Sequence, residues 1–189
     1  MKNRKKFFAF LLILVMLVTC ISPQQINAKT TGKKVAVTRE EWICALLKQA
    51  HIKTGKVSKY HFSDTKKSSK KKVIETAYSR GILPVKKNSK KFYPKKAATR
   101  EFMAVTTVRA LGFQANKAVS PKCKDKKKLK YPAEDKVALN QKIISLKKKQ
   151  FLPKKAITKA EKKKALRVVN KLNNTGKVDP EHKNVVTYQ

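Results

Sequence analysis

The chain has 189 residues, and its 48 lysines and arginines outnumber its 11 acidic residues so far that the formal net charge is +37. This charge predicts attraction to polyanions of any kind, whether nucleic acid, an acidic membrane or an anionic wall polymer. Apolar residues still make up 41% of the chain and occur in periodic segments, which excludes a wholly disordered basic tail and predicts a buried core.

Residues 1–28 have the features of a secretory signal peptide. The basic start Met1–Lys6 is followed by the apolar run Phe7–Cys20 and then by small and polar residues that end at Ala28. A helix over this run would be about 21 Å long, shorter than the roughly 30 Å hydrocarbon core of a bilayer. We therefore expect export, with a mature chain that begins near Lys29; an uncleaved membrane anchor and a lipoprotein are the alternatives.

The residues that usually carry catalysis or bind metals are few and scattered. Cys44 and Cys123 remain after the predicted cleavage, and Cys44 falls on an apolar helical face, where a small core residue is expected. The three histidines show no spacing typical of a metal site or of a nucleophile with its base. No Gly-rich phosphate loop, Ser/His/Asp set or carboxylate pair occurs either. We predict that the protein is not an enzyme and that it uses no cofactor and no metal ion.

A repeat runs through most of the chain. Thr38-Arg39-Glu40 recurs as Thr99-Arg100-Glu101 and then as Thr158-Lys159-Ala160-Glu161, at intervals of about 60 residues. Residues 60–83 align with residues 121–144 without a gap. This alignment places Asp64 opposite Asp125, Ala77 opposite Ala138, and Gly81 opposite Lys142. A correspondence in this order predicts repeated structural units.

Each full copy of the repeat predicts a helix, a loop and a second helix. In the middle copy, apolar residues recur at helical spacing over Lys70–Arg80, and Gly81 is typical of the residue that follows a helix. A threonine then opens the second helix as its N-cap, at Thr38, Thr99 and Thr158 in the three copies.

The residues inside the second helices support this interpretation. Glu41 and Glu161 follow their capping threonines by three residues and complete capping boxes, whereas Phe102 breaks the box in the middle copy. Apolar stripes predict that one face of each helix is buried. The stripes are Ile43, Leu46, Leu47 and Ala50; Val105, Val108 and Leu111; and Ala165, Val169 and Leu172.

The first residue of each second helix is basic: Arg39, Arg100 and Lys159. A cation at this position opposes the helix dipole and costs roughly 0.3–1 kcal/mol. Its recurrence therefore suggests a function, and a guanidinium beside free helix N–H groups is suited to bind a carboxylate or a phosphate. The alternative is an ordinary capped helix start.

The middle copy resembles the S-layer homology module. The resemblance rests on Phe62-Ser63-Asp64, Gly81-Ile82-Leu83, Phe92 and Pro94, Thr99-Arg100-Glu101, and Arg109-Ala110-Leu111-Gly112. The other two copies are degenerate, with only Thr38–Ile52 kept in the first, and Cys123 and Lys159 in place of the Phe and the Arg in the third. We assign residues 29–60 to a partial first module, 61–119 to the second, 120–174 to the third and 175–189 to a C-terminal tail.

The resemblance implies a mainly α-helical fold in which three helix-loop-helix modules pack with pseudo-threefold symmetry. It also implies non-covalent anchoring of a secreted protein to the wall or surface of a bacterium. Grooves between modules would bind an anionic secondary cell-wall polysaccharide, with peptidoglycan as a further candidate partner. The family's motif residues form or support such grooves, which points to Arg39, Arg100, Lys159, Asp64 and Asp125 as polymer-binding residues. Because Lys159 lacks the planar fork of arginine, we expect the third groove to bind more weakly.

Two other functions stay open. The lysine clusters would also suit a secreted cationic protein that binds extracellular nucleic acid or anionic membrane without specificity. However, the aromatic residues near them belong to the repeat pattern, so no specific nucleic-acid site is expected, and membrane contact is expected only through the signal peptide. The chain could instead be the anchor of a wall-remodelling enzyme whose catalytic part lies elsewhere.

Overall fold

The computed structural model describes residues 36–86, 88–116 and 119–174, so the predicted signal peptide and the predicted C-terminal tail lie outside the described residues. The described helices are α2 (Arg39–Gln49), α3 (Lys71–Ser79), α4 (Arg100–Ala110), α5 (Pro132–Asn140) and α6 (Lys159–Asn174), with short 3-10 helices η1 (Ser63–Thr65) and η2 (Lys126–Lys128). No strand occurs in these ranges. The expectation of a mainly α-helical fold is confirmed.

The second helices of the three repeats begin where the capping pattern predicts. Thr38 Oγ1 accepts from the N–H of Glu41, and the Glu41 carboxylate accepts from the N–H of Thr38 at 2.8 Å, which completes a capping box. Thr158 and Glu161 make the same reciprocal pair at the start of α6. At the start of α4, Thr99 Oγ1 caps the N–H of Phe102, and a phenylalanine cannot return a hydrogen bond.

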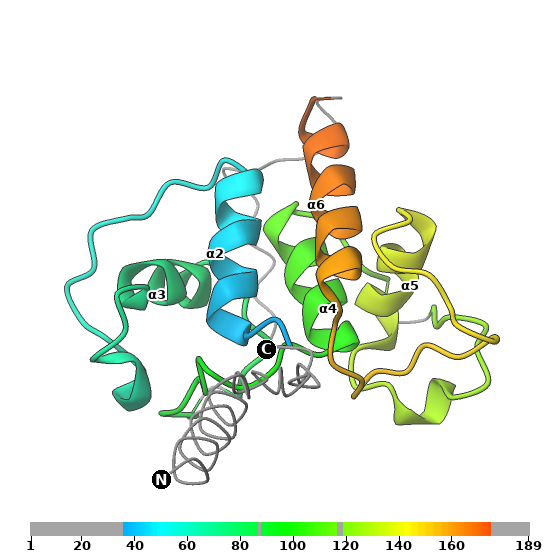
Figure 1. Ribbon diagram of the computed structural model, residues 1–189, viewed down its shortest axis with the longest axis horizontal. Coiled ribbons are helices and arrows are strands. Elements are labelled where there is room, and N and C mark those ends of the chain that lie inside the picture. The colour runs from blue at the N-terminus through cyan, green and yellow to red at the C-terminus, as the bar shows by residue number, and fades with distance from the viewer. Residues whose placement is uncertain (1–35, 87, 117–118, 175–189) are drawn as a thin grey trace, which may run out of the picture. The chain divides into compact units, whose positions relative to one another are not determined.

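The helices pack around one core (Figure 1). Helices α2 and α6 lie side by side, α4 packs against α2, α3 packs against α2, and α5 packs against α4. Trp42 of α2 is fully buried, and its indole Nε1 donates to Thr106 Oγ1 of α4 at 2.8 Å. The predicted apolar stripes of α2, α4 and α6 supply buried core residues such as Leu46, Val108 and Val169. Fully burying one such side chain contributes roughly 1.5–3 kcal/mol.

Consecutive repeats are also joined through their backbones. The segment before α2 meets the loop before α4 in a single antiparallel bridge, Thr38 with Ala97, and Thr99 meets Ala156 in the same way. The N–H groups of Arg39 and Arg100, at equivalent positions, each donate at 2.9 Å to a carbonyl of the following repeat. The packing of three modules about a pseudo-threefold axis stays a prediction.

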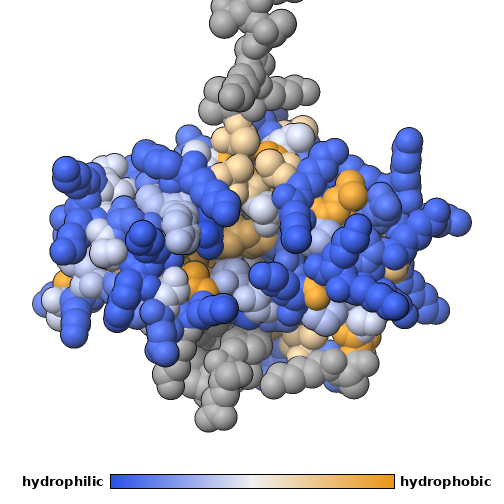
Figure 2. Space-filling model, turned by 90° about the horizontal axis from the view of Figure 1, so that it is seen from below, coloured by the Kyte–Doolittle hydropathy of each residue, from blue (hydrophilic) through white to orange (hydrophobic). Residues whose placement is uncertain are grey.

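The surface around this core is strongly hydrophilic. Seen from below, hydrophilic side chains cover most of the face, and apolar residues show between them (Figure 2). In the described residues, only Tyr93 and Val119 are exposed large apolar side chains. No helix in the described ranges has both the length and the apolar character needed to cross a membrane.

Candidate functional site

A tight turn places two aromatic residues, Phe92 and Tyr93, in front of α4. In the middle repeat, both carboxylate oxygens of Asp64 accept backbone hydrogen bonds, from Phe92 N at 2.9 Å and from Tyr93 N at 2.8 Å. Tyr93 has a φ of 59°, a left-handed conformation that is unfavourable for a residue other than glycine. The hydrogen bonds to Asp64 stabilise this turn, so Asp64 holds the loop in place.

Asp125 does the same in the third repeat. Its two oxygens accept from Phe151 N and Leu152 N, each at 2.8 Å, and Leu152 has a φ of 58°. Burial alone would raise the pKa of Asp125, but these hydrogen bonds outweigh burial and lower the pKa below its ordinary value. Both predicted aspartates therefore face their own loops, where they support the site.

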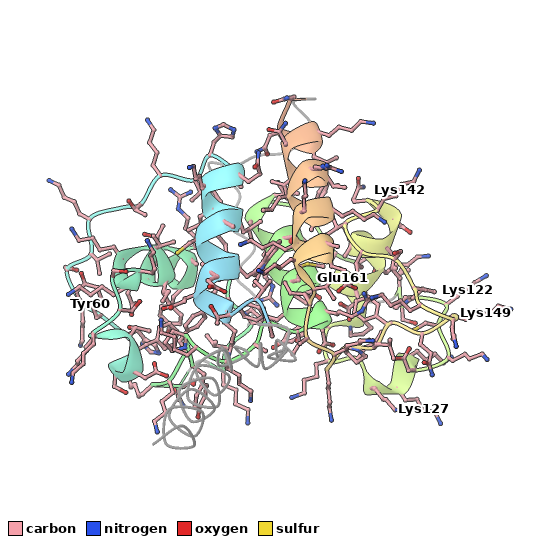
Figure 3. All side chains as sticks on the ribbon, in the orientation of Figure 1. Tyr60, Lys122, Lys127, Lys142, Lys149 and Glu161 are labelled. Carbon is pink, nitrogen blue, oxygen red and sulfur yellow. The ribbon has the colours of Figure 1, made fainter. Side chains whose placement is uncertain are left out.

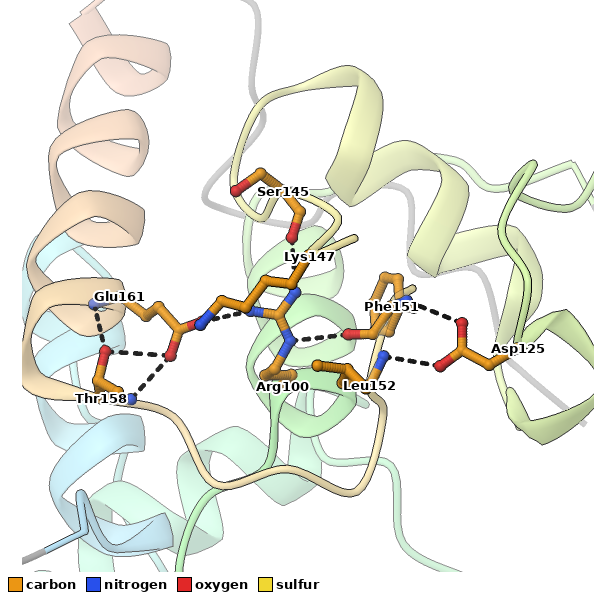
Figure 4. Close-up of polar contacts among 8 residues, drawn as sticks. All are labelled: Arg100, Asp125, Ser145, Lys147, Phe151, Leu152, Thr158 and Glu161. Carbon is orange, nitrogen blue, oxygen red and sulfur yellow. Dashed lines mark hydrogen bonds and ion pairs between the residues drawn. The ribbon is translucent and has the colours of Figure 1, made fainter. Parts of the chain in front are cut away.

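Arg100 lies in the interior, although a site at the surface was expected (Figure 4). Its side chain is 1% exposed. Nε donates to the Phe151 carbonyl at 2.7 Å, Nη2 to the Ser145 carbonyl at 2.6 Å, and Nη1 to the Glu161 carboxylate, with which it forms an ion pair. The guanidinium thus joins α4 to the third repeat.

Glu161 is the centre of this network. It also pairs with the Lys147 ammonium at 2.7 Å and accepts from Thr158. Burial alone would raise the pKa of Glu161, but Lys147, Thr158 and Arg100 outweigh burial and lower the pKa to about 2. Glu161 is therefore ionised at neutral pH, and it compensates the charge of Arg100.

Arg39 occupies the same repeat position as Arg100 but has other neighbours. Its guanidinium lies over two rings, 4.8 Å from the centroid of Phe92 and 4.4 Å from that of Phe102. No described residue accepts a hydrogen bond from its Nε, which is shielded from solvent, and none forms an ion pair with it. Burial lowers the pKa of Arg39, and the charges of Asp64, Tyr131 and Tyr93 act in the opposite direction.

The residue three positions into the following helix explains the difference. For Arg100 that residue is Glu161, which forms the ion pair, and for Arg39 it is Phe102, which offers a ring but no charge. Cation–π contact holds a guanidinium in place without neutralising it. We refer to Arg39, Phe92, Tyr93 and Phe102 as the Arg39 corner. It presents a cation between aromatic rings that no described carboxylate contacts in an ion pair, although Asp64 lies near enough to stabilise its charge.

The expectation of free backbone N–H groups at the helix starts is wrong for α2 and α4. The sequence suggested free N–H groups at the helix starts, but Arg39 N and Glu40 N donate to Lys96 O and Pro94 O, and the two equivalent N–H groups of α4 are used in the same way. Carbonyl groups in the loop of the following repeat accept hydrogen bonds from these N–H groups, which are therefore not free to bind an anion. Among the three second helices, only α6 begins with N–H groups, those of Lys159 and Ala160, that have no such acceptor in the described residues, and the Lys159 side chain is exposed.

A comparison with known protein families matches residues 61–104 to the S-layer homology domain. The chain carries an S-layer homology domain. Such domains generally anchor proteins to the cell wall through secondary cell-wall polymers, and they bind without catalysing a reaction. The protein is therefore a cell-surface or cell-wall protein of a bacterium. The curated proteins contain no match to this chain.

The matched S-layer homology domain contains Asp64 and Arg100, whereas Arg39, Asp125 and Lys159 lie outside residues 61–104. The structure brings Arg39 and Asp64 together at one corner, and Arg100 and Asp125 at the equivalent one. Sequence reasoning missed the role of Phe102, which it recorded only as a broken capping box. The alignment of Phe102 with Glu161 could have revealed this role. Arg39 has a phenylalanine at the position where Arg100 has the carboxylate that neutralises it.

Metal-binding groups and cysteines are the other features considered in the part of the chain that the structure describes. No group of three or more His, Cys, Asp or Glu side chains there is placed to hold a metal ion. Cys44 and Cys123 are both free thiols. Burial raises the pKa of each thiol, which makes both poor nucleophiles at neutral pH.

Proposed function

We propose that the protein is exported and binds non-covalently to an anionic secondary cell-wall polysaccharide, with the Arg39 corner as the main contact. The observation that carries this proposal is the guanidinium between Phe92 and Phe102, with which no described residue forms an ion pair. A carboxylate or phosphate of the polymer would pair with the Nη atoms of Arg39, which, unlike Nε, are not among the buried atoms without a partner. Tyr93, which is 51% exposed, would offer its ring face to a sugar.

The other four predicted residues have different parts in this proposal. Asp64 and Asp125 fix the loops that shape the corners, and Arg100 holds the second and third repeats together. Lys159 marks a third corner, which would bind more weakly because an ammonium cannot donate a planar pair of hydrogen bonds. Direct contact with the polymer is thus assigned to Arg39 first and to Lys159 second.

The test compares two wall preparations, one intact and one chemically stripped of its secondary polymer to bare peptidoglycan. Purified protein is sedimented with each across a salt series. We expect retention on intact walls at high salt and loss on stripped walls. Arg39→Gln should weaken retention about tenfold or more, since a hydrogen bond to a charged group contributes roughly 1.5–3 kcal/mol.

Arg167→Gln is the matched control, because Arg167 is exposed on α6 and its loss changes the net charge equally. Retention of Arg39→Gln equal to that of Arg167→Gln would contradict the role of the Arg39 corner. Equal binding to both wall preparations, fading steeply with salt, would instead favour a cationic protein that binds nucleic acid or membrane as readily as wall.

A further inference from the structure

A cavity in the third repeat shares no lining residue with the Arg39 corner. Its volume is about 740 Å³, within the roughly 300–1,000 Å³ typical of small-molecule sites. Its lining combines an apolar part with four lysines. The residues are Val119, Ser120, Pro121, Lys122, Cys123, Lys124, Lys126, Leu146 and Lys149.

The residues of the middle repeat that align with Lys122 and Cys123 carry rings that pack on their neighbours. There Phe62 is fully buried, with its ring centroid 5.6 Å from that of Phe92, and His61 stacks on Tyr78 at 4.1 Å. The repeat alignment puts Cys123 opposite Phe62 and Lys122 opposite His61. A thiol is much smaller than a phenyl ring, and Cys123 lines the cavity of the third repeat.

The same segment has gained positive charge. Lys122, Lys124 and Lys126 align with His61, Ser63 and Thr65, so the third repeat has lysines at three positions where the second has none. Lys149 aligns with Lys90. The loss of a ring and the gain of three ammonium groups thus occur at one place in the molecule.

Hydrogen bonds hold the two walls of the cavity together. Lys124 N donates to Lys149 O at 2.9 Å, and Asp125 fixes the residues that follow Lys149 in the chain. Figure 3 shows Lys122 and Lys149 side by side at the end of the molecule farthest from α3. Lys149 has a φ of 62°, in a turn closed by two hydrogen bonds of 2.8 Å between Lys147 and Gln150. The lysines on both walls therefore have fixed backbones.

We propose that this lysine-rimmed cavity beside Cys123 is a second binding site, which takes an acidic saccharide unit. The ammonium groups would pair with a carboxylate or phosphate on the sugar, while Val119, Pro121 and Leu146 would contact its apolar ring face. The proposal rests on the proposed function in one respect, since the wall polymer would be the source of the saccharide. Two sites on one chain would raise the avidity for a polymer of repeating acidic units.

Cys123 provides a reporter inside the cavity. Purified protein is treated with iodoacetamide, a neutral reagent, at alkaline pH, and alkylation of Cys123 is followed by mass spectrometry with Cys44 as the internal reference. The probes are a hyaluronan tetrasaccharide, which is acidic, chitotetraose, which is neutral, and inorganic phosphate. We expect the acidic tetrasaccharide to slow alkylation of Cys123 several-fold and to leave Cys44 unchanged, with little effect of the other two probes.

Two pairs of variants separate the cavity from general surface charge. Lys122→Gln with Lys149→Gln should abolish the protection, whereas Lys66→Gln with Lys67→Gln removes the same charge from exposed residues of the second repeat and should retain it. Cys123→Phe keeps every lysine and fills the cavity, and by calorimetry it should bind the acidic tetrasaccharide several-fold more weakly than the parent. A thermal melt of each variant establishes that it is folded.

The outcomes distinguish this proposal from the proposed function. Protection that persists in Arg39→Gln would support a separate site, even if wall retention were lost. Equal slowing of both cysteines, equal protection by inorganic phosphate, or unchanged tetrasaccharide binding by Cys123→Phe would overturn the second site, whatever Arg39→Gln does to wall retention.

Discussion

At the residue scale, two arginines at equivalent positions have opposite surroundings. Arg100 makes three hydrogen bonds in the interior and is neutralised by Glu161, whereas Arg39 lies on aromatic rings without an acidic partner. A buried charge is tolerated only when it is paired and hydrogen-bonded. Loss of Arg100 should therefore reduce the stability of the fold, whereas loss of Arg39 should reduce binding.

Arg100→Gln should lower the free energy of unfolding by about 3 kcal/mol, because breaking a buried ion pair leaves an uncompensated partner. Lys147 still faces Glu161 and limits the loss. Denaturation in guanidinium chloride measures the change. Arg39→Gln, the control, loses cation–π contacts but no ion pair, and should lower stability by only about 1 kcal/mol. An Arg100→Gln protein as stable as the parent would show that the network in Figure 4 does not hold the repeats together.

Asp135 has an unusual environment for a carboxylate. It is fully buried on α5, close to the carboxylates of Glu101 and Glu134. Burial, with the charges of Glu101 and Glu134, raises its pKa to about 9, so it is protonated at neutral pH. The repeat alignment places it opposite Ile74, an apolar core residue.

This raised pKa predicts how stability depends on pH. The unfolded chain releases the Asp135 proton near the ordinary value of about 4, while the folded protein keeps it until about 9. The stability contribution is therefore fully present below the lower value and is lost as pH rises towards the higher one. Asp135→Asn should remove this loss and be more stable than the parent at alkaline pH by about 1–3 kcal/mol. Thermal melts across that range test it, and parallel pH profiles would contradict it.

At the element scale, local chemistry accounts well for helix starts and ends. The capping threonines precede α2, α4 and α6 as predicted, and α3 covers Lys71–Ser79 where Lys70–Arg80 was expected. Gly81, with a φ of 66°, follows α3 in the left-handed conformation that glycine adopts without strain. These features depend on neighbours within a few residues, which is why the sequence alone predicts them.

Lys142 departs from this pattern. It follows α5 with a φ of 57°, at the position that Gly81 takes after α3. A side chain in this conformation is strained, so Lys142→Gly should stabilise the protein by about 0.5–1 kcal/mol, net of the entropy that glycine gains in the unfolded chain. Lys136→Gly, within α5, should instead destabilise it by about 1 kcal/mol. Urea denaturation of both variants provides the comparison, and the prediction fails if both lose stability.

At the scale of the whole molecule, long-range contacts join the repeats. The buried indole of Trp42 donates a hydrogen bond to Thr106, and Gln49 of α2 donates to Asn170 of α6 at 2.9 Å. The first N–H groups of α2 and α4 donate to the loop of the next repeat. None of these pairings follows from spacing along the chain. The backbone hydrogen bonds among them occupy the N–H groups at the starts of α2 and α4, which were expected from the sequence to be free.

The sequence by itself determined the mainly helical fold, the positions of the helices, and the repeat that led to the S-layer homology domain. These depend on local capping, periodicity and self-similarity, which can be read from neighbouring residues. Only the tertiary structure decided that Arg100 is buried, that Asp64 and Asp125 hold loops, and that Arg39 has no ion-pair partner among the described residues. The physical reason is that a side chain's charge balance is set by partners about 60 residues away, such as Phe102 and Glu161.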